Sequence, residues 1–530
     1  ELDRYNSSYP ARETVIIHNL ESGPLQHFIG YADINSDLIH KINLNELGEW
    51  ERLVINCQKQ MYQEEALTKY YDINDYDLFH DMHKLQEREY STQSLVFLLN
   101  FLELHNNNLV KQLKEPVYTN MEGRVKLGNH SLRQLNIIDV GKKGKNSSLM
   151  SIVNKCKTPM GKRFLSDKLL NPTCDSEYLT SEYNMIDYVL TGVPGKDSMF
   201  GELDNIVDFE RIFRKIILNK IAPSELSQLF DNLKTINKLT VDIGRDLKLN
   251  NYLIMPNLSL SVTNLESKLN NFIDINKSSD ISSRDFEENI FIKGVFQELD
   301  DVEFKYLHEL KKLDVIKGFL SNCINDIQGT GKQSTKQSTK HSSKQSNGIG
   351  KQSNGKPTID AVRVHKTEKS GLFLITTKTR FSKLKKNLSS DNIPRLPDMH
   401  TLTYEFNNVS YTLELNLSTI KESNSGGNNV RLDSSMITDI YHKISQTKSN
   451  FKEVLMSHYN KYIASFLEYK NCFEVVINFV IKTDFLFTRA HVATINNYCK
   501  PEIDDSPKYS FLQASDIRHP LIEKIQEHEI

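Results

Sequence analysis

The sequence predicts a multidomain, mainly α-helical protein with a small α/β domain, a helical body with long helices, and an antiparallel β module inserted between those helices. Three observations lead to this fold class. Apolar residues recur with helical spacing over residues 146–325 and again over 436–497. Between these stretches the apolar period switches to two. Residues 12–57 mix strand-like and helix-like segments, and a length of 530 residues allows about three to five domains.

The first region is predicted to be a small sheet with helices. Glu13–His18, Phe28–Asn35 and Arg52–Cys57 are rich in β-forming residues and predict strands, whereas Asp37–Trp50 has the spacing of a helix. Alternating strands and helices favour a doubly wound or related α/β fold. From about Ser91 leucines recur at helical spacing, so a helix is expected there.

The helical body is divided by start and stop signals. Ser148 precedes an apolar stripe that ends before Pro159, and the next helix ends at Asn171. Ile206–Ile217 predicts a further helix, and Pro223 marks the start of another. These signals indicate several helices of ordinary length.

The β module lies between the long apolar stripes of Phe286–Phe319 and the helical spacing that resumes at Met436. Asn407 and Asn408 predict a tight hairpin turn, because Asn tolerates positive φ. We expect a four-stranded antiparallel module. Its predicted strands are Val362–His365, Leu372–Thr377, Thr401–Phe406 and Ser410–Leu415.

Composition is typical of a globular protein, and the absence of targeting signals leads us to expect an intracellular one, of the nucleus or cytoplasm. Hydrophobic residues make up 38% and charged residues 25%. No run reaches the ~20 apolar residues of a membrane span, and no secretory signal is visible near the start. The six cysteines form no C-x-x-C motif, so we expect reduced, mostly buried thiols and no metal site.

Charge is unevenly distributed along the chain. The net charge is −2, but Lys332–Lys386 contains 14 Lys and Arg against two acids, a local balance of +12 that leaves −14 for the rest. Residues 329–357 are a degenerate polar repeat and predict a disordered low-complexity linker. The basic stretch is therefore either a phosphate-binding surface or a solvated loop.

Several short motifs, taken in order, resemble those of the MutS family of DNA mismatch-repair ATPases. Each is weak alone, but their order and spacing resemble the family over nearly the whole chain. The motifs are Leu127–Leu135, Ser148–Leu165 with Asn171-Pro172, Asp208–Ile212, Pro223–Leu226, Asn497–Pro501 and Arg518–Glu523.

The resemblance implies a layout of six regions. These would be a connector-like α/β domain at 1–115, the core and ascending lever helices at 116–328, the linker at 329–357, a β clamp at 358–435, descending lever helices at 436–500 and the start of an ATPase domain at 501–530. It also implies ATP and Mg²⁺ as cofactors, bound by a P-loop downstream of Ile530. We therefore expect no catalytic, cofactor-binding or metal-binding residues within this chain and no ATP hydrolysis by it as given.

The family's clamp grips the DNA backbone, so the lysines of this region become candidate contacts. Such contacts position a protein without reading sequence, and five of them would give a log–log salt slope of about −4 to −5. The alternative is that these lysines only keep the module soluble. The candidates are Lys366, Lys369, Lys378, Arg380, Lys383, Lys385 and Lys386.

Three functions remain open from the sequence. The first is the DNA-binding body of a mismatch-repair ATPase, acting on mispaired duplex as a homo- or heterodimer with another MutS-like subunit and with no membrane partner. The second is a relative that clamps branched recombination junctions without reading mismatches. The third is a helical scaffold whose β module binds protein.

Overall fold

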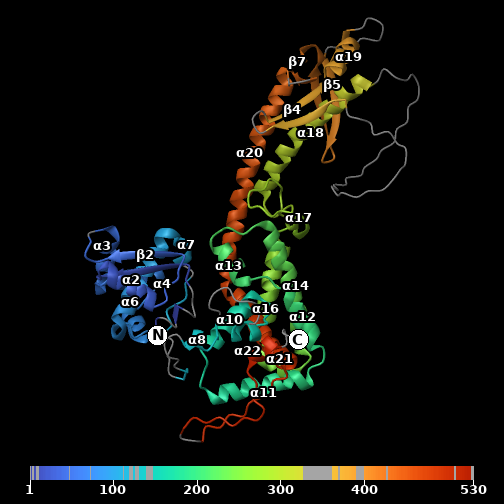
Figure 1. Ribbon diagram of the computed structural model, residues 1–530. Coiled ribbons are helices and arrows are strands. Elements are labelled where there is room, and N and C mark those ends of the chain that lie inside the picture. The colour runs from blue at the N-terminus through green and yellow to red at the C-terminus, as the bar shows by residue number, and fades with distance from the viewer. Residues whose placement is uncertain are drawn as a thin grey trace. The chain divides into compact units, whose positions relative to one another are not determined.

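The structure, a computed structural model, separates into two compact units (Figure 1). Unit 1 comprises residues 1–285 and 460–530, and unit 2 comprises Phe286–Tyr459. The predicted fold class is confirmed: the molecule is mainly helical, with small sheets, among them antiparallel sheets between long helices. The structure describes residues 2–526 apart from 3–4, 7–10, 47, 72, 111–112, 118–122, 126–130, 139–146, 326–360, 368–370, 390–398, 425–427 and 507–508.

Unit 1 begins with a parallel β-α-β element. Strands β1 (Glu13–His18) and β2 (Leu38–Asn43) pair in parallel, and helix α2 (Ser22–Tyr31) connects them. Of the three strands predicted within residues 12–57, only Glu13–His18 is therefore confirmed. Helix α3 (Glu49–Cys57) covers the segment predicted as the third strand.

The wrong strand prediction for Arg52–Cys57 has a physical cause. Short apolar runs fit either a strand or a buried helix, and their tertiary partner decides between them. Val54 and Cys57 of α3 are buried at i, i+3 spacing in a cluster with Val96 and Phe97 of helix α6 (Glu89–His105). The helix predicted from about Ser91 is thus confirmed, and it selects the helical form of α3.

The rest of unit 1 is a bundle of helices around the long helix α21 (Lys470–Asn496). The predicted helices after Ser148, Pro159 and Pro223 are all present and begin where their N-caps indicate. The remaining α-helices of unit 1 are α4 (Gln60–Tyr71), α5 (Tyr76–Met82), α7 (Asn107–Val110), α8 (Ser131–Gln134), α9 (Leu149–Val153), α10 (Pro159–Leu170), α11 (Ser176–Gly192), α12 (Lys196–Glu202), α13 (Phe209–Ile217), α14 (Pro223–Gly244), α15 (Leu247–Leu253), α16 (Leu258–Asn270), α17 (Ile275–Ser279) and α22 (Pro520–Gln526).

A fully buried carboxylate joins α21 to the start of α10. Asp484 accepts hydrogen bonds from the backbone N–H of Lys157 (3.0 Å) and of Thr158 (2.8 Å). The hydroxyls of Thr158 (2.7 Å) and Thr488 (3.1 Å) donate to it as well. The positive end of the α10 dipole also favours an anion at this point. Burial and the charge of Asp484 raise the pKa of the neighbouring Cys156 thiol to about 12.

Gly161 makes room for that carboxylate. A Cβ at this position would lie 2.2 Å from Oδ2 of Asp484 and 2.8 Å from its Cγ, so any side chain would displace the group. We expect Gly161→Ala to lower the free energy of unfolding of unit 1 by about 2–4 kcal/mol, because overpacking and lost hydrogen bonds act together. Denaturant unfolding followed by circular dichroism measures this loss.

Gly318, inside helix α18 of unit 2, supplies the matched control, because a Cβ there meets no atom within 4 Å. Gly318→Ala should stabilise unit 2 by about 0.5–1 kcal/mol, as Gly→Ala does in an open helix interior. Two substitutions of equal sign would contradict the role given to Gly161.

Helix α10 makes contacts on two opposite sides. Arg163, one turn beyond the start of α10, reaches out to both carboxylate oxygens of Asp208 (2.8 and 2.9 Å) and to Glu210. Asp208 also caps α13 by accepting from the backbone N–H of Arg211. Burial would raise the pKa of Asp208, but these hydrogen bonds outweigh it and lower the pKa. The motif around residues 158–163 therefore ties α10 to α21 on one side and to α13 on the other.

Unit 2 consists of two long helices that carry the β module at one end (Figure 1). Helix α18 (Gln297–Asn325) and helix α20 (Ser435–Ala464) pack against each other. The ring of Tyr306 in α18 stacks on the ring of Phe451 in α20, with 5.8 Å between the ring centroids. Helix α18 begins later than predicted, because Gly294 has a φ of +89° that no α-helix includes.

The β module contains all four predicted strands, but they do not form one sheet. β3 (Arg363–Thr367) and β4 (Gly371–Thr377) belong to an antiparallel sheet of order β3-β4-β8-β7. β5 (Met399–Phe406) and β6 (Val409–Asn416) form a separate hairpin, whose predicted turn is confirmed by φ values of +48° and +62° at Asn407 and Asn408. The strands β7 (Lys421–Asn424) and β8 (Asn429–Asp433) were not predicted, because they are short and largely polar.

The cysteines depart from one expectation. All six are free thiols, but only Cys57 and Cys156 are buried, whereas Cys174 and Cys499 are exposed. The prediction of mostly buried thiols is therefore wrong. Within the described residues, no helix is both long enough and apolar enough to cross a membrane.

Candidate nucleic-acid interface

Helix α19 (Lys378–Ser389) is the most basic element of unit 2 and follows β4 directly. Phe381 and Leu384, spaced i, i+3, are 5% and 1% exposed and pack into the core cluster of unit 2. The hydroxyl of Thr377 accepts the backbone N–H of Arg380, and the N–H of Lys378 donates to the carbonyl of Asn428. One face of α19 is thus fixed to the module, and its other face is left to solvent.

The structure places five of the seven predicted DNA-binding residues on this helix. Lys378, Lys383, Lys385 and Lys386 are exposed, and Arg380 is half-buried at the flank. Lys366 lies in β3, although only its backbone is described, and Lys369 lies outside the described residues. The sequence predicts only strands in this region, but a helix carries these five residues. Phe381, Leu384 and Leu388 have the helical spacing that could have revealed it.

The exposed face of α19 is a cationic strip. Spacings of four residues place Lys378, Ser382 and Lys386 on one stripe, and Lys383 lies beside it. From Lys378 to Lys386 the strip is about 12 Å long, at ~1.5 Å per residue. That length matches about three to four phosphates of one DNA strand, which are spaced ~3.4 Å along the axis.

No acid neutralises the strip within its own sequence. Residues 361–389 contain eight Lys and Arg and a single acid, Glu368, a net charge of +7. Two further groups that sequence reasoning did not single out are the hydroxyls of Thr379 and Ser382, which are exposed among the lysines. Arg363, exposed on β3, adds another cation to the module. The arrangement can bind a polyanion through the point charges of its lysines.

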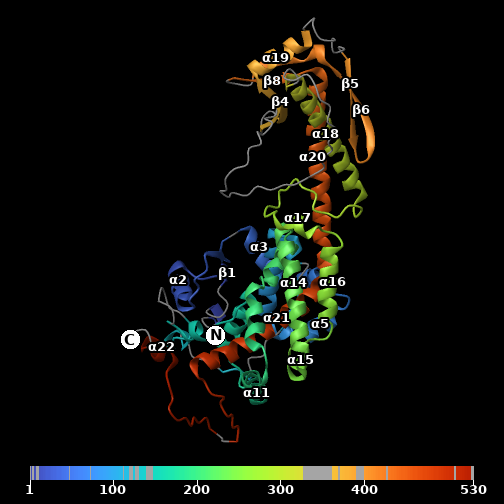
Figure 2. The same cartoon turned by 90° about the vertical axis from the view of Figure 1, so that its right-hand side faces the viewer.

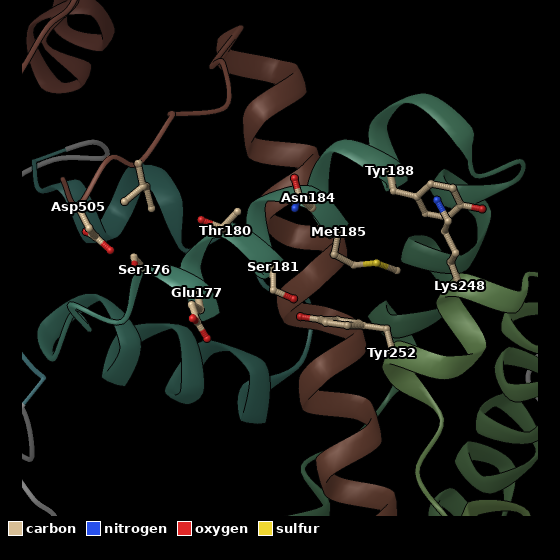
Figure 3. Close-up of a pocket in the computed structure, with 11 residues that line it drawn as sticks. Ser176, Glu177, Thr180, Ser181, Asn184, Met185, Tyr188, Lys248, Tyr252 and Asp505 are labelled. Carbon is tan, nitrogen blue, oxygen red and sulfur yellow. The ribbon is translucent and has the colours of Figure 1, made fainter.

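Unit 1 has a polar hollow of about 570 Å³ beside α11 (Figure 3). Three of its polar lining residues already have partners. Tyr188 donates to Asp246 at 2.6 Å, the ammonium of Lys248 lies over the Tyr188 ring, and the hydroxyl of Tyr252 bonds to Glu182. These contacts occupy the polar ends of Tyr188, Lys248 and Tyr252.

Metal ligands do not converge in the part of the chain that the structure describes. No group of three or more His, Cys, Asp or Glu side chains there is arranged to hold an ion.

Comparisons with a family model and with curated proteins match this chain to the same family. The family described as MutS domain III matches residues 130–490. A protein named as a MutS homolog in DNA mismatch repair, from Acanthamoeba polyphaga mimivirus, is 23% identical over 100% of this chain and 46% of its own length. The DNA mismatch repair proteins MutS of Caldanaerobacter subterraneus and Petrotoga mobilis are each 20% identical, over 84% and 92% of this chain and 43% and 51% of their own. The chain thus spans about half the length of the curated relatives that it matches.

Proposed function

The chain belongs to the MutS family, and from this premise we propose that it is the body of a mismatch-repair protein that clasps duplex DNA. In this proposal unit 2 supplies the clamp, and its grip is coupled to the ATPase domain that the family resemblance implies. The six-region layout, with connector, levers and clamp, is part of the proposal, as are a MutS-like partner subunit and a site of action in the nucleus or cytoplasm.

The cationic strip of α19 is the observation that carries the proposal. It lies at the end of unit 2 that bears the β module, on the tip of two long antiparallel helices (Figure 2). Phe381 and Leu384 anchor its apolar side, so the lysines are held outward on a fixed element. When such cations contact DNA phosphates, the counterions condensed on those phosphates are released. This release favours binding to DNA of any base sequence.

The test is binding of the 530-residue chain to labelled homoduplex, mispaired duplex and branched DNA over a range of salt concentrations. About four phosphate contacts predict a log–log slope of roughly −3.6 on duplex DNA. Preference for the mispair supports mismatch repair, and preference for branched DNA supports the junction-clamping alternative. A folded chain that binds none of the three DNAs, or binds without salt dependence, would overturn the proposal in favour of a protein-binding scaffold.

A further inference from the structure

Ser382 lies in the middle of the cationic strip and is surrounded by lysines at contact spacing. It follows Lys378 by four residues and precedes Lys385 and Lys386 by three and four. Side chains three and four residues apart are neighbours on a helix surface. The Ser382 side chain is exposed, and its hydroxyl donates to the carbonyl of Lys378 at 3.0 Å, so the oxygen is held on this face.

These surroundings suit a phosphate group. A phosphoserine carries a charge of about −1.5 to −2 at pH 7 and three strong acceptor oxygens. At position 382 it would meet Lys378, Lys385 and Lys386 without an acid among residues 369–389 to repel it. Charge-assisted hydrogen bonds of this kind are about twice as strong as neutral ones.

The local sequence also suits enzymes that add phosphate beside basic residues. Lys378 and Arg380 precede Ser382 by four and two residues, and Lys383 follows it. A kinase would reach Ser382 when α19 leaves its packing site, and a helix of 12 residues is only marginally stable without such packing.

We propose that Ser382 is a phosphorylation site and that its phosphate switches off DNA binding by occupying the lysines that would hold a DNA phosphate. A serine kinase that prefers basic sequences transfers the γ-phosphoryl group of ATP. The bond from phosphorus to the Ser382 oxygen forms, the bond from phosphorus to the ADP oxygen breaks, and the hydroxyl proton passes to the kinase base. The inference rests on the proposed function, because it concerns the same surface.

The expected loss of DNA affinity follows from the charge of the phosphate at Ser382. A phosphate of nearly −2 cancels about two of four lysine contacts, so the salt slope should fall from roughly −3.6 to roughly −1.8. At 0.1 M salt this corresponds to a loss of affinity on the order of 10- to 60-fold.

The experiment treats the full chain with ATP and a purified serine kinase of basic specificity, locates the phosphate by mass spectrometry, and measures duplex binding. Phosphorylated chain and Ser382→Glu should bind more weakly and with a shallower salt slope, whereas Ser382→Ala should show the same DNA affinity before and after treatment with the kinase. Ser410→Glu, on the exposed surface of the β5–β6 hairpin, adds the same charge away from α19 and should change affinity little.

The outcomes separate the two proposals. If the unmodified chain binds DNA but the kinase leaves Ser382 unmodified, or the phosphate leaves affinity unchanged, the switch is overturned and the proposed function stands. If the unmodified chain does not bind DNA, both are overturned. Thermal unfolding of each variant shows whether a loss of binding comes from a loss of folding.

Discussion

Asp484→Ala should lower the free energy of unfolding of unit 1 by about 3–5 kcal/mol, a large share of the 5–15 kcal/mol that a domain typically has. The wild-type carboxylate is fully buried and accepts from two backbone N–H groups and two hydroxyls. Alanine leaves the N–H groups of Lys157 and Thr158 without an acceptor, and each orphaned buried donor costs about 1–3 kcal/mol. It also removes the anion that complements the start of α10.

Denaturant unfolding, with native-state hydrogen exchange at residues 157 and 158, measures this effect. Asp231→Ala is the control, because Asp231 is exposed in the same unit and pairs only at 3.9 Å with Lys234, so its loss should cost little. Equal stability of the Asp484 and Asp231 variants would show that the buried carboxylate does not hold α21 to α10.

Lys383→Glu combined with Lys386→Glu should weaken duplex binding on the order of 100-fold at 0.1 M salt, the largest functional effect that we expect. Each lost phosphate contact removes a factor of about 8 at that salt concentration, and the two new carboxylates add repulsion. Both side chains are exposed on α19 opposite Phe381 and Leu384, so the substitutions leave the packed face intact. Fluorescence anisotropy against salt concentration gives both the affinity and the slope.

A matched charge reversal distinguishes the strip from the net charge of the chain. Lys305→Glu with Lys443→Glu changes the charge by the same amount on the exposed surfaces of α18 and α20. The control pair should reduce affinity far less than the α19 pair. Similar losses from both pairs would mean that DNA responds to the overall field and that α19 is not the contact surface.

The sequence by itself determined the mainly helical class, the helices with clear caps, and the turn at Asn407 and Asn408. These features depend on interactions between near neighbours, which apolar spacing and capping residues record directly. The basic character of residues 361–389 was equally plain, because charge is a property of composition.

Tertiary structure alone decided the rest. The segment Arg52–Cys57 became a helix because α6 packs against it, and β7 and β8 became strands because β4 pairs with β8. The lysines came to lie on one face of α19 because Phe381 and Leu384 found a core. Asp484 meets Thr158 across 326 residues of sequence, and no local pattern predicts such a contact, because its energy arises only when the two segments are buried together.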